Sequence, residues 1–475
     1  MSKKNDFFKE ILRVCTSNLL IVLSGVFVGF IIPKVLGVTQ YGYYKTFTLY
    51  ASYIGVMSLG ISEGMYLKYS GTEYDDLEVG KIRLLTKHVF RIQLIAAVII
   101  CIVASLFLEG EKTFIFFAIA IYLIELNHTT YYQYVSQMTM RFNDYSMRNI
   151  VKSVLTIGFV ILFYIAYLMN DKTDISYRYY VFSVLLISTL LWILYALKYR
   201  NLTFGNSSKL REEKEEIIGL MRLGIPYLIA SLCSTLILSI DRQFVSILFT
   251  TEEYSMYAFA YNMLSLVTVC ASAISTVLYP SLKQSASSKE EITKQLSILC
   301  GNVLCFAFFM LLAYYPLSFI VIYFLSQYVD SLQIFRIIFP GVAITSVISV
   351  VIQNYYKLVE KNTLYLIKNI IILIISGVAN FVAYKLAGTT ASISVASIVT
   401  ILFYYIFAQE YFVREYRIKW KKNLMYALIM MLIFYSVTAI ENYIIGFLIY
   451  TGAFMVITIV LYGKELKLLL KKIRR

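Results

Sequence analysis

The sequence predicts an all-helical membrane protein with about fourteen transmembrane helices. Of its 475 residues, 59% are hydrophobic and the mean hydropathy is +0.72. Only 15% are charged, whereas a soluble chain carries about 25%. The apolar runs are continuous and about as long as the roughly 20 residues that cross a bilayer, without the alternation typical of a transmembrane barrel. These observations exclude a soluble enzyme and a single anchor with a large globular head.

Fourteen apolar segments follow one another along the chain. The last two are separated only by Glu441, Asn442 and a few neighbours, so a re-entrant pair is the alternative there. The segments have the approximate bounds 14–36, 43–67, 89–108, 113–136, 149–169, 179–197, 217–249, 254–279, 295–324, 331–356, 364–386, 390–411, 424–441 and 443–462.

The basic residues are distributed unevenly between alternate loops. The formal net charge is +15, which in a soluble protein would suggest nucleic-acid binding. With the N-terminus placed in the cytoplasm, 35 of the 43 Lys and Arg residues fall on the cytoplasmic side and seven on the outer side. Cytoplasmic loops are enriched in Lys and Arg. The bias therefore predicts cytoplasmic N- and C-termini and no nucleic-acid partner.

The chain begins with a basic stretch and an apolar run that resemble a secretory signal. The run is about twenty residues long and no small-residue cleavage site follows, so we expect a retained first helix. The outer loops are short, and the sequence contains no GxxxxGK[ST], GxGxxG after a strand, HExxH or GxSxG motif. We therefore expect a protein that is not an enzyme and has no cofactor and no bound metal.

A polar, charge-mixed stretch divides the chain near its middle. Two halves of six segments each suit the internal repeats that are common in transporters. The predicted domains are a six-helix lobe (1–198), a cytoplasmic linker (199–216), a second six-helix lobe (217–412), and two extra helices with a basic tail (413–475).

Asp241 and Arg242 lie inside the seventh apolar segment, roughly 10 Å outward of its midpoint. An ionisable side chain at this depth costs about 2.5–3.5 kcal/mol on insertion scales, and such residues usually face a bundle interior or a wet cavity. The residues indicate either an interhelical salt bridge that locks one conformation or a role in transport. A bridge that forms in one state only would be a gate.

Other polar residues also interrupt apolar segments. Glu63 lies near the inner end of the second segment, where it either gates transport or reaches the headgroups. Glu125 and His128 share one helix face, which favours a buried hydrogen-bonded pair over a proton relay or a metal pair. Two GxxxG motifs, Gly25 to Gly29 and Gly60 to Gly64, permit close helix contacts. Three prolines fall where they can kink membrane helices, at Pro226, Pro316 and Pro340.

Several motifs, taken in order along the chain, resemble one known family. Leu36-Gly37 and Tyr41-Gly42-Tyr43 fit its opening pattern, whereas Ser255 departs from a glycine usual in the second half. Further matches are Gly60 with Glu63, Arg141-Phe142-Asn143-Asp144-Tyr145, Asp241-Arg242 followed by Tyr254, and Val277-Leu278-Tyr279-Pro280-Ser281-Leu282. The sequence is similar to the bacterial polysaccharide (O-antigen and capsule repeat-unit) flippases of the multidrug/oligosaccharidyl-lipid/polysaccharide exporter superfamily.

The resemblance implies a two-lobed, MATE-like fold with a central cavity in the bacterial cytoplasmic membrane. It also implies export of undecaprenyl-pyrophosphate-linked oligosaccharides, membrane lipids as surroundings, and a polysaccharide polymerase of the same pathway as a partner. The alternatives are a lipid II flippase and a cation-coupled multidrug antiporter of the same fold.

Transport of such a molecule requires cations for its pyrophosphate and groups that gate the path or couple it to a proton or sodium gradient. The predicted substrate-binding residues are Arg242, Lys34, Lys45, Asn18, Tyr261 and Asn262. The predicted gating or ion-coupling residues are Asp241, Glu63 and Glu125.

Overall fold

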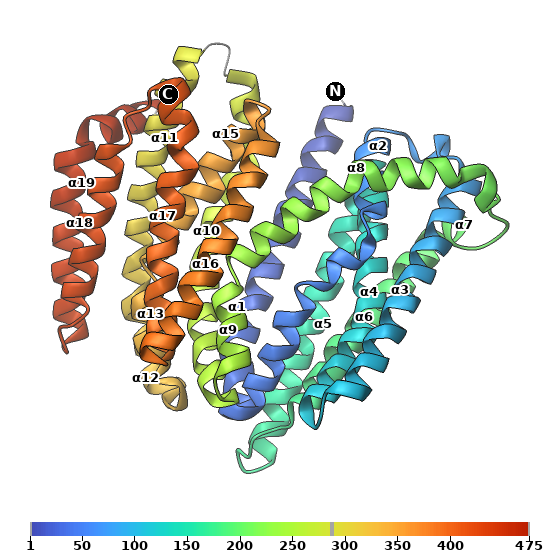
Figure 1. The fold of residues 1–475 in the computed structure, drawn as a ribbon, viewed down its shortest axis with the longest axis horizontal. Coiled ribbons are helices and arrows are strands. Elements are labelled where there is room, and N and C mark those ends of the chain that lie inside the picture. The colour runs from blue at the N-terminus through green and yellow to red at the C-terminus, as the bar shows by residue number, and fades with distance from the viewer. Residues whose placement is uncertain (1, 286–288, 474–475) are drawn as a thin grey trace. The chain divides into compact units, whose positions relative to one another are not determined.

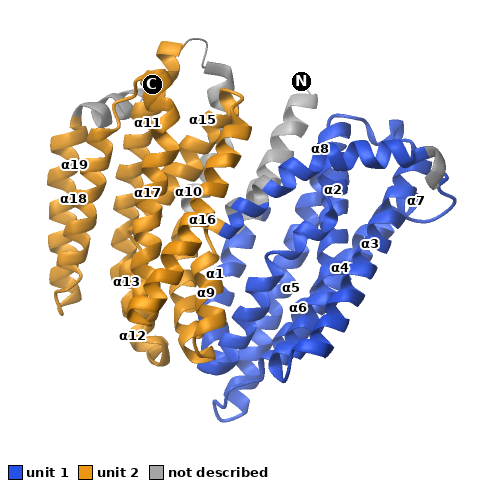
Figure 2. Cartoon of the chain, in the orientation of Figure 1, with its two compact units in different colours: residues 1–236 blue, residues 237–475 orange. Residues whose placement is uncertain are grey.

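In the computed structural model, the backbone is described for residues 2–285 and 289–473, and this part of the chain contains helices and no strand. Side chains are described for residues 17, 20–209, 213–229, 232–233, 235–268 and 289–463. The chain divides into two compact units, residues 1–236 and 237–475 (Figure 2). The predicted all-helical fold class is therefore confirmed.

Unit 1 is a bundle in which α1 packs on α4, α5 and α6, and α3 packs on α4 (Figure 1). Its buried core includes Ile61, Met65, Leu85 and Tyr131. The unit contains, in chain order, α1 (Ser2–Ala51), η1 (Ile54–Ser58), α2 (Ile61–Tyr69), η2 (Tyr74–Asp76), α3 (Val79–Phe107), α4 (Glu111–Met138), α5 (Phe142–Met169), α6 (Tyr177–Lys198), α7 (Arg200–Thr203) and α8 (Leu210–Ile237).

Unit 2 is built around α17, which packs on α13, α14 and α16, while α18 and α19 pack on α11. The unit contains α9 (Ile240–Leu248), α10 (Thr251–Ser285), α11 (Lys289–Met310), η3 (Leu311–Ala313), α12 (Tyr314–Phe324), η4 (Ser326–Tyr328), α13 (Ser331–Ile338), α14 (Gly341–Ser346), the π-helix η5 (Val347–Ile352), α15 (Gln353–Leu358), α16 (Asn362–Ala387), α17 (Thr390–Tyr416), α18 (Lys421–Val437) and α19 (Tyr443–Ile473).

Every predicted apolar segment falls on a helix or a run of consecutive helices, although the segment 424–441 extends past the end of α18 at Val437. Helices suit such segments because a backbone in lipid must satisfy its hydrogen bonds internally. By length and composition, nine helices of the described chain are able to cross a membrane, or up to ten if a bent pair is one span. The chain is thus a multi-pass membrane protein, and the count of fourteen spans is compatible with this result.

The first predicted segment and the beginning of the second share the single helix α1, which is interrupted at Gly37. This residue has φ 69° and ψ 179°, outside the helical region. A Cβ atom at Gly37 would lie 1.9 Å from an Asp174 carboxylate oxygen. The loop that carries Asp174 is held against the interruption, because Ile175 N–H donates to the Val35 carbonyl at 3.0 Å. A glycine is therefore required here by backbone angle and by space.

The predicted seventh segment is broken at Leu238 and Ser239, which separate α8 from α9. A second break at Pro340 separates α13 from α14, with a bend of 44°, as expected of a proline that removes a helical hydrogen bond. Compact packing divides the chain after Leu236, so α8 belongs to unit 1. The predicted lobes, 1–198 and 217–412, are groups of helices expected to move together during transport, and this division stays a prediction.

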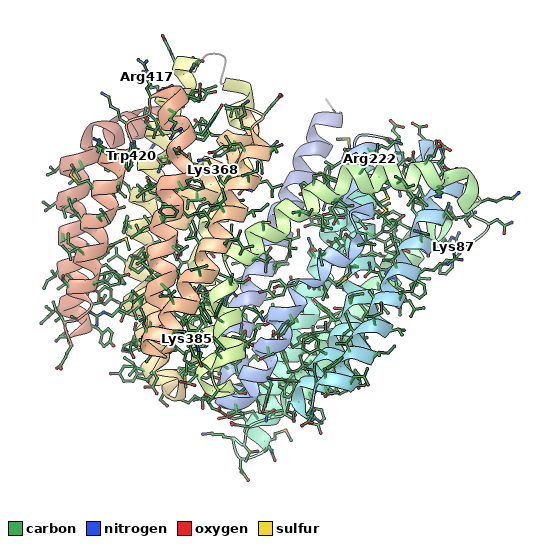
Figure 3. The ribbon with its side chains drawn as sticks, in the orientation of Figure 1. Lys87, Arg222, Lys368, Lys385, Arg417 and Trp420 are labelled. Atoms are coloured by element: carbon green, nitrogen blue, oxygen red, sulfur yellow. The ribbon has the colours of Figure 1, made fainter. Side chains whose placement is uncertain are left out.

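The connection between α6 and α8, residues 199–209, is held against α3, and we call it the linker strap. Arg83 Nε donates to the Asn201 carbonyl at 2.7 Å, and its Nη1 donates to the Asn206 carbonyl at 3.1 Å. Lys87, labelled in Figure 3, donates from Nζ to the Gly205 carbonyl at 2.9 Å. These bonds fix a polar segment that its composition alone would suggest to be loose.

Candidate functional site

Asp241 lies in the first turn of α9 and is only 3% exposed. The short helix packs against α10, α16 and α17. Its carboxylate Oδ2 accepts hydrogen bonds from Tyr257 Oη at 2.8 Å, from Ser397 Oγ at 3.3 Å, and from Tyr261 Oη. Its Oδ1 accepts from the backbone N–H of Arg242 at 2.7 Å. A carboxylate with this many donors is held in one position inside the apolar bundle of unit 2.

Arg242 does not neutralise Asp241 through its side chain. Within the described chain no ion pair joins its guanidinium to an acid; instead Nη2 donates to the Leu238 carbonyl at 2.8 Å. The guanidinium carbon lies 4.8 Å from the Tyr261 ring centroid, within the range of a cation–π contact. Nε is buried and has no hydrogen-bond partner among the described residues. The side chain is oriented by Tyr261 and retains donor capacity for an anion.

The structure therefore brings Asp241, Arg242 and Tyr261 together. It adds two residues that sequence reasoning missed, Tyr257 and Ser397. Tyr257 lies one helical turn before Tyr261 on α10, and this spacing was the signal that could have found it. Ser397 comes from α17, and nothing in a single sequence pairs it with a residue 156 positions earlier. Asn262 follows Tyr261 on α10 and is half-buried.

Glu63 lies in unit 1, in the first turn of α2, and is 7% exposed. Its Oε2 accepts a hydrogen bond from Ser58 Oγ at 2.8 Å. Gly60, the residue before the helix, has φ 74°. The carboxylate is thus close to a helix N-terminus, where negative charge is stabilised. This location is internal, and it does not match the interfacial alternative in which Glu63 reaches the headgroups.

Glu125 and His128 are both buried in α4, with 4% and 2% exposure. The expected hydrogen bond between them is wrong for the described side chains: Glu125 Oε1 accepts from Thr189 at 2.5 Å, and His128 Nδ1 donates to the Ile124 carbonyl at 2.9 Å. Glu125 Oε2 and His128 Nε2 are buried without partners. The His128 ring packs 5.2 Å from Trp192, so its orientation is set by aromatic packing.

The remaining predicted cations lie on either side of the Gly37 interruption. Lys34 is half-buried in α1. The Lys45 amine lies 5.1 Å from the Tyr41 ring centroid and 5.8 Å from the Tyr44 centroid, so two aromatic faces stabilise its charge. The side chain of Asn18 lies outside the described residues. In the described chain no group of three or more His, Cys, Asp or Glu residues has the arrangement of a metal site.

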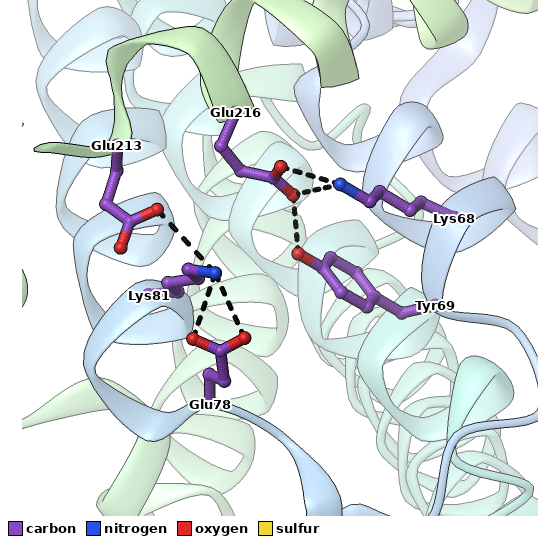
Figure 4. Close-up of polar contacts among 6 residues, drawn as sticks. All are labelled: Lys68, Tyr69, Glu78, Lys81, Glu213 and Glu216. Carbon is purple, nitrogen blue, oxygen red and sulfur yellow. Dashed lines mark hydrogen bonds and ion pairs between the residues drawn. The ribbon is translucent and has the colours of Figure 1, made fainter.

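One end of unit 1 carries a cluster of ionic contacts between α2, α3 and α8, shown in Figure 4. Lys68 Nζ donates to both Glu216 oxygens at 2.7 and 2.6 Å. Tyr69 Oη donates to Glu216 Oε1 at 2.6 Å. Lys81 Nζ lies 3.9 Å from a Glu213 oxygen and pairs with Glu78 at 2.9 Å. We call these six residues the α2–α8 clamp.

The helices meet closely beside this clamp. A Cβ atom at Gly64 would lie 2.0 Å from the Leu220 carbonyl oxygen, and one at Gly224 would lie 1.9 Å from the Gly60 carbonyl oxygen. The predicted close contact of the Gly60 motif is therefore confirmed, with α8 as its partner. At Gly25 a Cβ atom would have no described heavy atom within 4 Å, so the close contact expected for the Gly25 to Gly29 motif stays a prediction.

The α2–α8 clamp should persist through the neutral range and open in acid. Burial raises the pKa of Glu216, but hydrogen bonds from Lys68 and Tyr69 outweigh it and hold the pKa below its usual 4.5. A depressed carboxylate pKa stabilises the fold above the unfolded value, and this contribution is lost as the pH falls through the folded value. Protonation of Glu216 in acid therefore leaves Lys68 without its charged acceptor on α8.

Spin labels at the exposed positions Ser70 and Lys214 would test this expectation. We expect a narrow distance distribution between pH 5 and 9 that broadens below about pH 4. In the Glu216→Gln variant the distribution should already be broad at pH 7. A distance distribution that changes neither in acid nor with the Glu216→Gln substitution would contradict the role of the clamp.

A family model for polysaccharide biosynthesis proteins matches residues 7–286. The match covers more than half of the chain and includes α9, with Asp241 and Arg242. The chain belongs to this family.

The fold of this polysaccharide biosynthesis protein is also found in solved transporter structures. A structure described as lipid II flippase MurJ in an inward closed conformation matches with a TM-score of 0.70 and 13% identity, covering 96% of this chain and 99% of that one. An inward-facing multidrug resistance MATE family transporter of the MOP superfamily matches with a TM-score of 0.53 and 13% identity, covering 85% and 98%. No curated protein sequence matches the chain significantly.

Unit 2 of this polysaccharide biosynthesis protein contains a buried cation that the charge count assigned to a loop. Lys368 lies on α16, whose opposite end carries Lys385 (Figure 3). Lys368 is 4% exposed, and its Nζ donates to the Phe407 carbonyl at 2.6 Å and to Glu410 Oε2 at 2.9 Å. Because both acceptors lie on α17, the residue joins two helices and is not available to a ligand.

Proposed function

We propose that this chain flips undecaprenyl-pyrophosphate-linked oligosaccharide repeat units across the bacterial cytoplasmic membrane, with both termini in the cytoplasm. The observation that carries the proposal is the pair Asp241 and Arg242 on α9, two ionised groups held inside an apolar helical bundle. Membership of the polysaccharide biosynthesis family supports a saccharide substrate. The chain itself acts as a transporter and not as an enzyme.

The physical problem is to move a sugar head and a pyrophosphate past a hydrocarbon layer roughly 30 Å thick, while the lipid tail stays in the bilayer. Alternating access solves it if a polar path opens to one side at a time. In this scheme Arg242 attracts the pyrophosphate, assisted by Lys34 and Lys45, while Asn18, Tyr261 and Asn262 contact sugar. Asp241, Glu63 and Glu125 gate the path or couple it to a proton or sodium gradient.

The geometry around α9 supports different roles for Asp241 and Arg242. Asp241 is saturated with donors from α10 and α17, so its charge is used inside the protein. Arg242 is held by Tyr261 and Leu238 but has a buried Nε without a partner, so it has donor capacity left for a phosphate oxygen. A change of protonation or ion occupancy at Asp241 would move Tyr261, and with it the guanidinium.

A lipid II flippase is the second candidate, favoured by the TM-score of 0.70 with the MurJ structure. The fold alone is the weaker argument, since the identity is 13%. Disruption of the gene separates the two functions. Loss of surface polysaccharide in viable cells supports the proposal, whereas loss of viability without a change in other polysaccharides supports lipid II. The multidrug antiporter alternative predicts sensitivity to organic cations in the same strain.

The Arg242→Ala variant should reduce surface polymer to below about a tenth of the wild-type amount, because a charge-assisted contact to a phosphate is worth about 1.5–3 kcal/mol. The lipid-linked repeat unit should accumulate in the inner leaflet. Arg242→Lys keeps the charge and should retain part of the export. The amount of variant protein in the membrane is the control. Normal polymer with Arg242→Ala at wild-type membrane levels would discard the role of this residue.

A further inference from the structure

Unit 1 has a partly open cavity of about 130 Å³ between four of its helices, α1, α4, α5 and α6. This is well above the 10–15 Å³ that holds one water molecule. Six of the lining side chains carry hydroxyl groups: Tyr44, Tyr122, Thr156, Tyr180, Ser183 and Ser188. Four further lining side chains are apolar: Val28, Phe159, Val184 and Ile187. The cavity is therefore polar in parts but lies in a bundle whose helices are long and apolar.

The only charged side chain in this lining is Lys152. It is the eleventh residue of α5, about 15 Å along the helix axis from Phe142. Its side chain is exposed, although its helix packs against α1, α4 and α6. Among the described residues no acidic side chain forms an ion pair with Lys152, and Glu125 is bonded to Thr189 and does not line the cavity.

A lysine at this depth in a membrane helix is costly unless a partner compensates its charge. A structural lysine in this fold is satisfied internally, as Lys368 is by Phe407 and Glu410. Lys152 has no such partner among the described residues, although the charge count alone would assign it to a cytoplasmic loop. A negative group of a bound molecule would compensate this charge.

We propose that the Lys152 cavity binds an oxyanion of the transported molecule, a carboxylate or a phosphate attached to a hydroxyl-rich sugar. The amine supplies the charge, the tyrosine, serine and threonine hydroxyls match sugar hydroxyls, and the aromatic rings pack on the apolar face of a sugar ring. The edge-on contact of Tyr44 and Tyr180, with centroids 4.9 Å apart, fixes one wall of the site. The proposal rests on the proposed function, since it names the charge class of the same substrate.

Two sources supply this chemistry, an acidic sugar of the repeat unit and the pyrophosphate of the lipid carrier. The test uses the full chain in phosphatidylcholine nanodiscs with three probes: glucuronate, inorganic pyrophosphate and neutral glucose. Reductive methylation followed by peptide mass spectrometry reports the reactivity of each lysine. We expect glucuronate, pyrophosphate or both to slow the methylation of Lys152 at least about threefold, while glucose does not. Lys172, in an exposed loop of the same unit, is the internal control.

Calorimetric titration of two variants gives an independent readout. Lys152→Gln should weaken binding of the protecting probe at least about tenfold, the usual size of one charge-assisted hydrogen bond. Lys152→Arg should stay within a few-fold of the wild type, and Lys172→Gln should not differ from it.

Protection by glucuronate alone assigns the site to an acidic sugar, and protection by pyrophosphate alone assigns it to the lipid carrier. Equal reactivity of Lys152 with all probes, or wild-type binding by Lys152→Gln, overturns the proposal. The protection measurement uses the wild-type protein, so it does not depend on the folding of a variant. It also does not involve transport: normal surface polymer after gene disruption would refute the proposed function and leave this result unchanged.

Discussion

Replacement of Asp241 by alanine should abolish export and destabilise unit 2. The carboxylate accepts hydrogen bonds from Tyr257, Ser397 and Tyr261, and all three donors would lose their partner inside the bundle. A buried donor without a partner costs about 1–3 kcal/mol. We expect surface polymer below about a hundredth of the wild-type amount, together with a lower melting temperature of the detergent-solubilised protein.

The Asp241→Asn variant separates the charge from the packing. Asparagine has nearly the same volume, but its amide group would face either the hydroxyl cluster or the backbone N–H of Arg242. We expect a melting temperature closer to the wild type and export still below about a tenth, because asparagine cannot take up and release a proton and lacks the negative charge that would hold a sodium ion. Glu441→Gln, which removes an exposed carboxylate of the same unit, is the matched control. Wild-type export by Asp241→Asn would refute the coupling role.

The Gly224→Ala substitution should force α8 away from α2. The added methyl group would lie 1.9 Å from the Gly60 carbonyl oxygen and 2.6 Å from the Gly64 nitrogen, and both are backbone atoms that cannot rotate away. Overpacking of this kind costs about 1–3 kcal/mol. We expect a lower melting temperature and a longer, broader distance between spin labels at Ser70 and Lys214.

Gly219→Ala is the matched control, since it adds the same methyl group to the same helix at a position with no described heavy atom within 4 Å. This variant should resemble the wild type or be slightly more stable, because alanine favours a helix over glycine. If the two alanine variants behave alike, the close approach of α2 and α8 is not what stabilises this arrangement.

Hydropathy and charge predicted the class of fold because a backbone in lipid can satisfy its hydrogen bonds only in helices or closed barrels. The same reasoning could not place the breaks within the segments. Gly37 interrupts α1 with a non-helical backbone angle, at a point approached by Asp174, a residue 137 positions away. The break before α9 lies at Leu238 and Ser239 between two isoleucines, Ile237 and Ile240, so a hydropathy average does not show it.

The residues of the candidate site were predictable where a charged side chain interrupts an apolar membrane segment. Asp241, Arg242, Glu63 and Glu125 are charged residues in apolar runs, and each is buried or half-buried in the structure. Their partners were not predictable, because Ser397 and Thr189 come from helices far away in the chain. Lys152 was missed for a different reason: it lies near the end of an apolar run, where a cation is usually interfacial.

The linker strap has a mechanical consequence. Its carbonyl groups accept hydrogen bonds from Arg83 and Lys87 of α3, so the strap cannot extend when the following helix, α8, is displaced. We expect α3 and the beginning of α8 to move together as one rigid body. We expect a hinge for the later helices beyond the beginning of α8, at the interruption of Leu238 and Ser239 between α8 and α9.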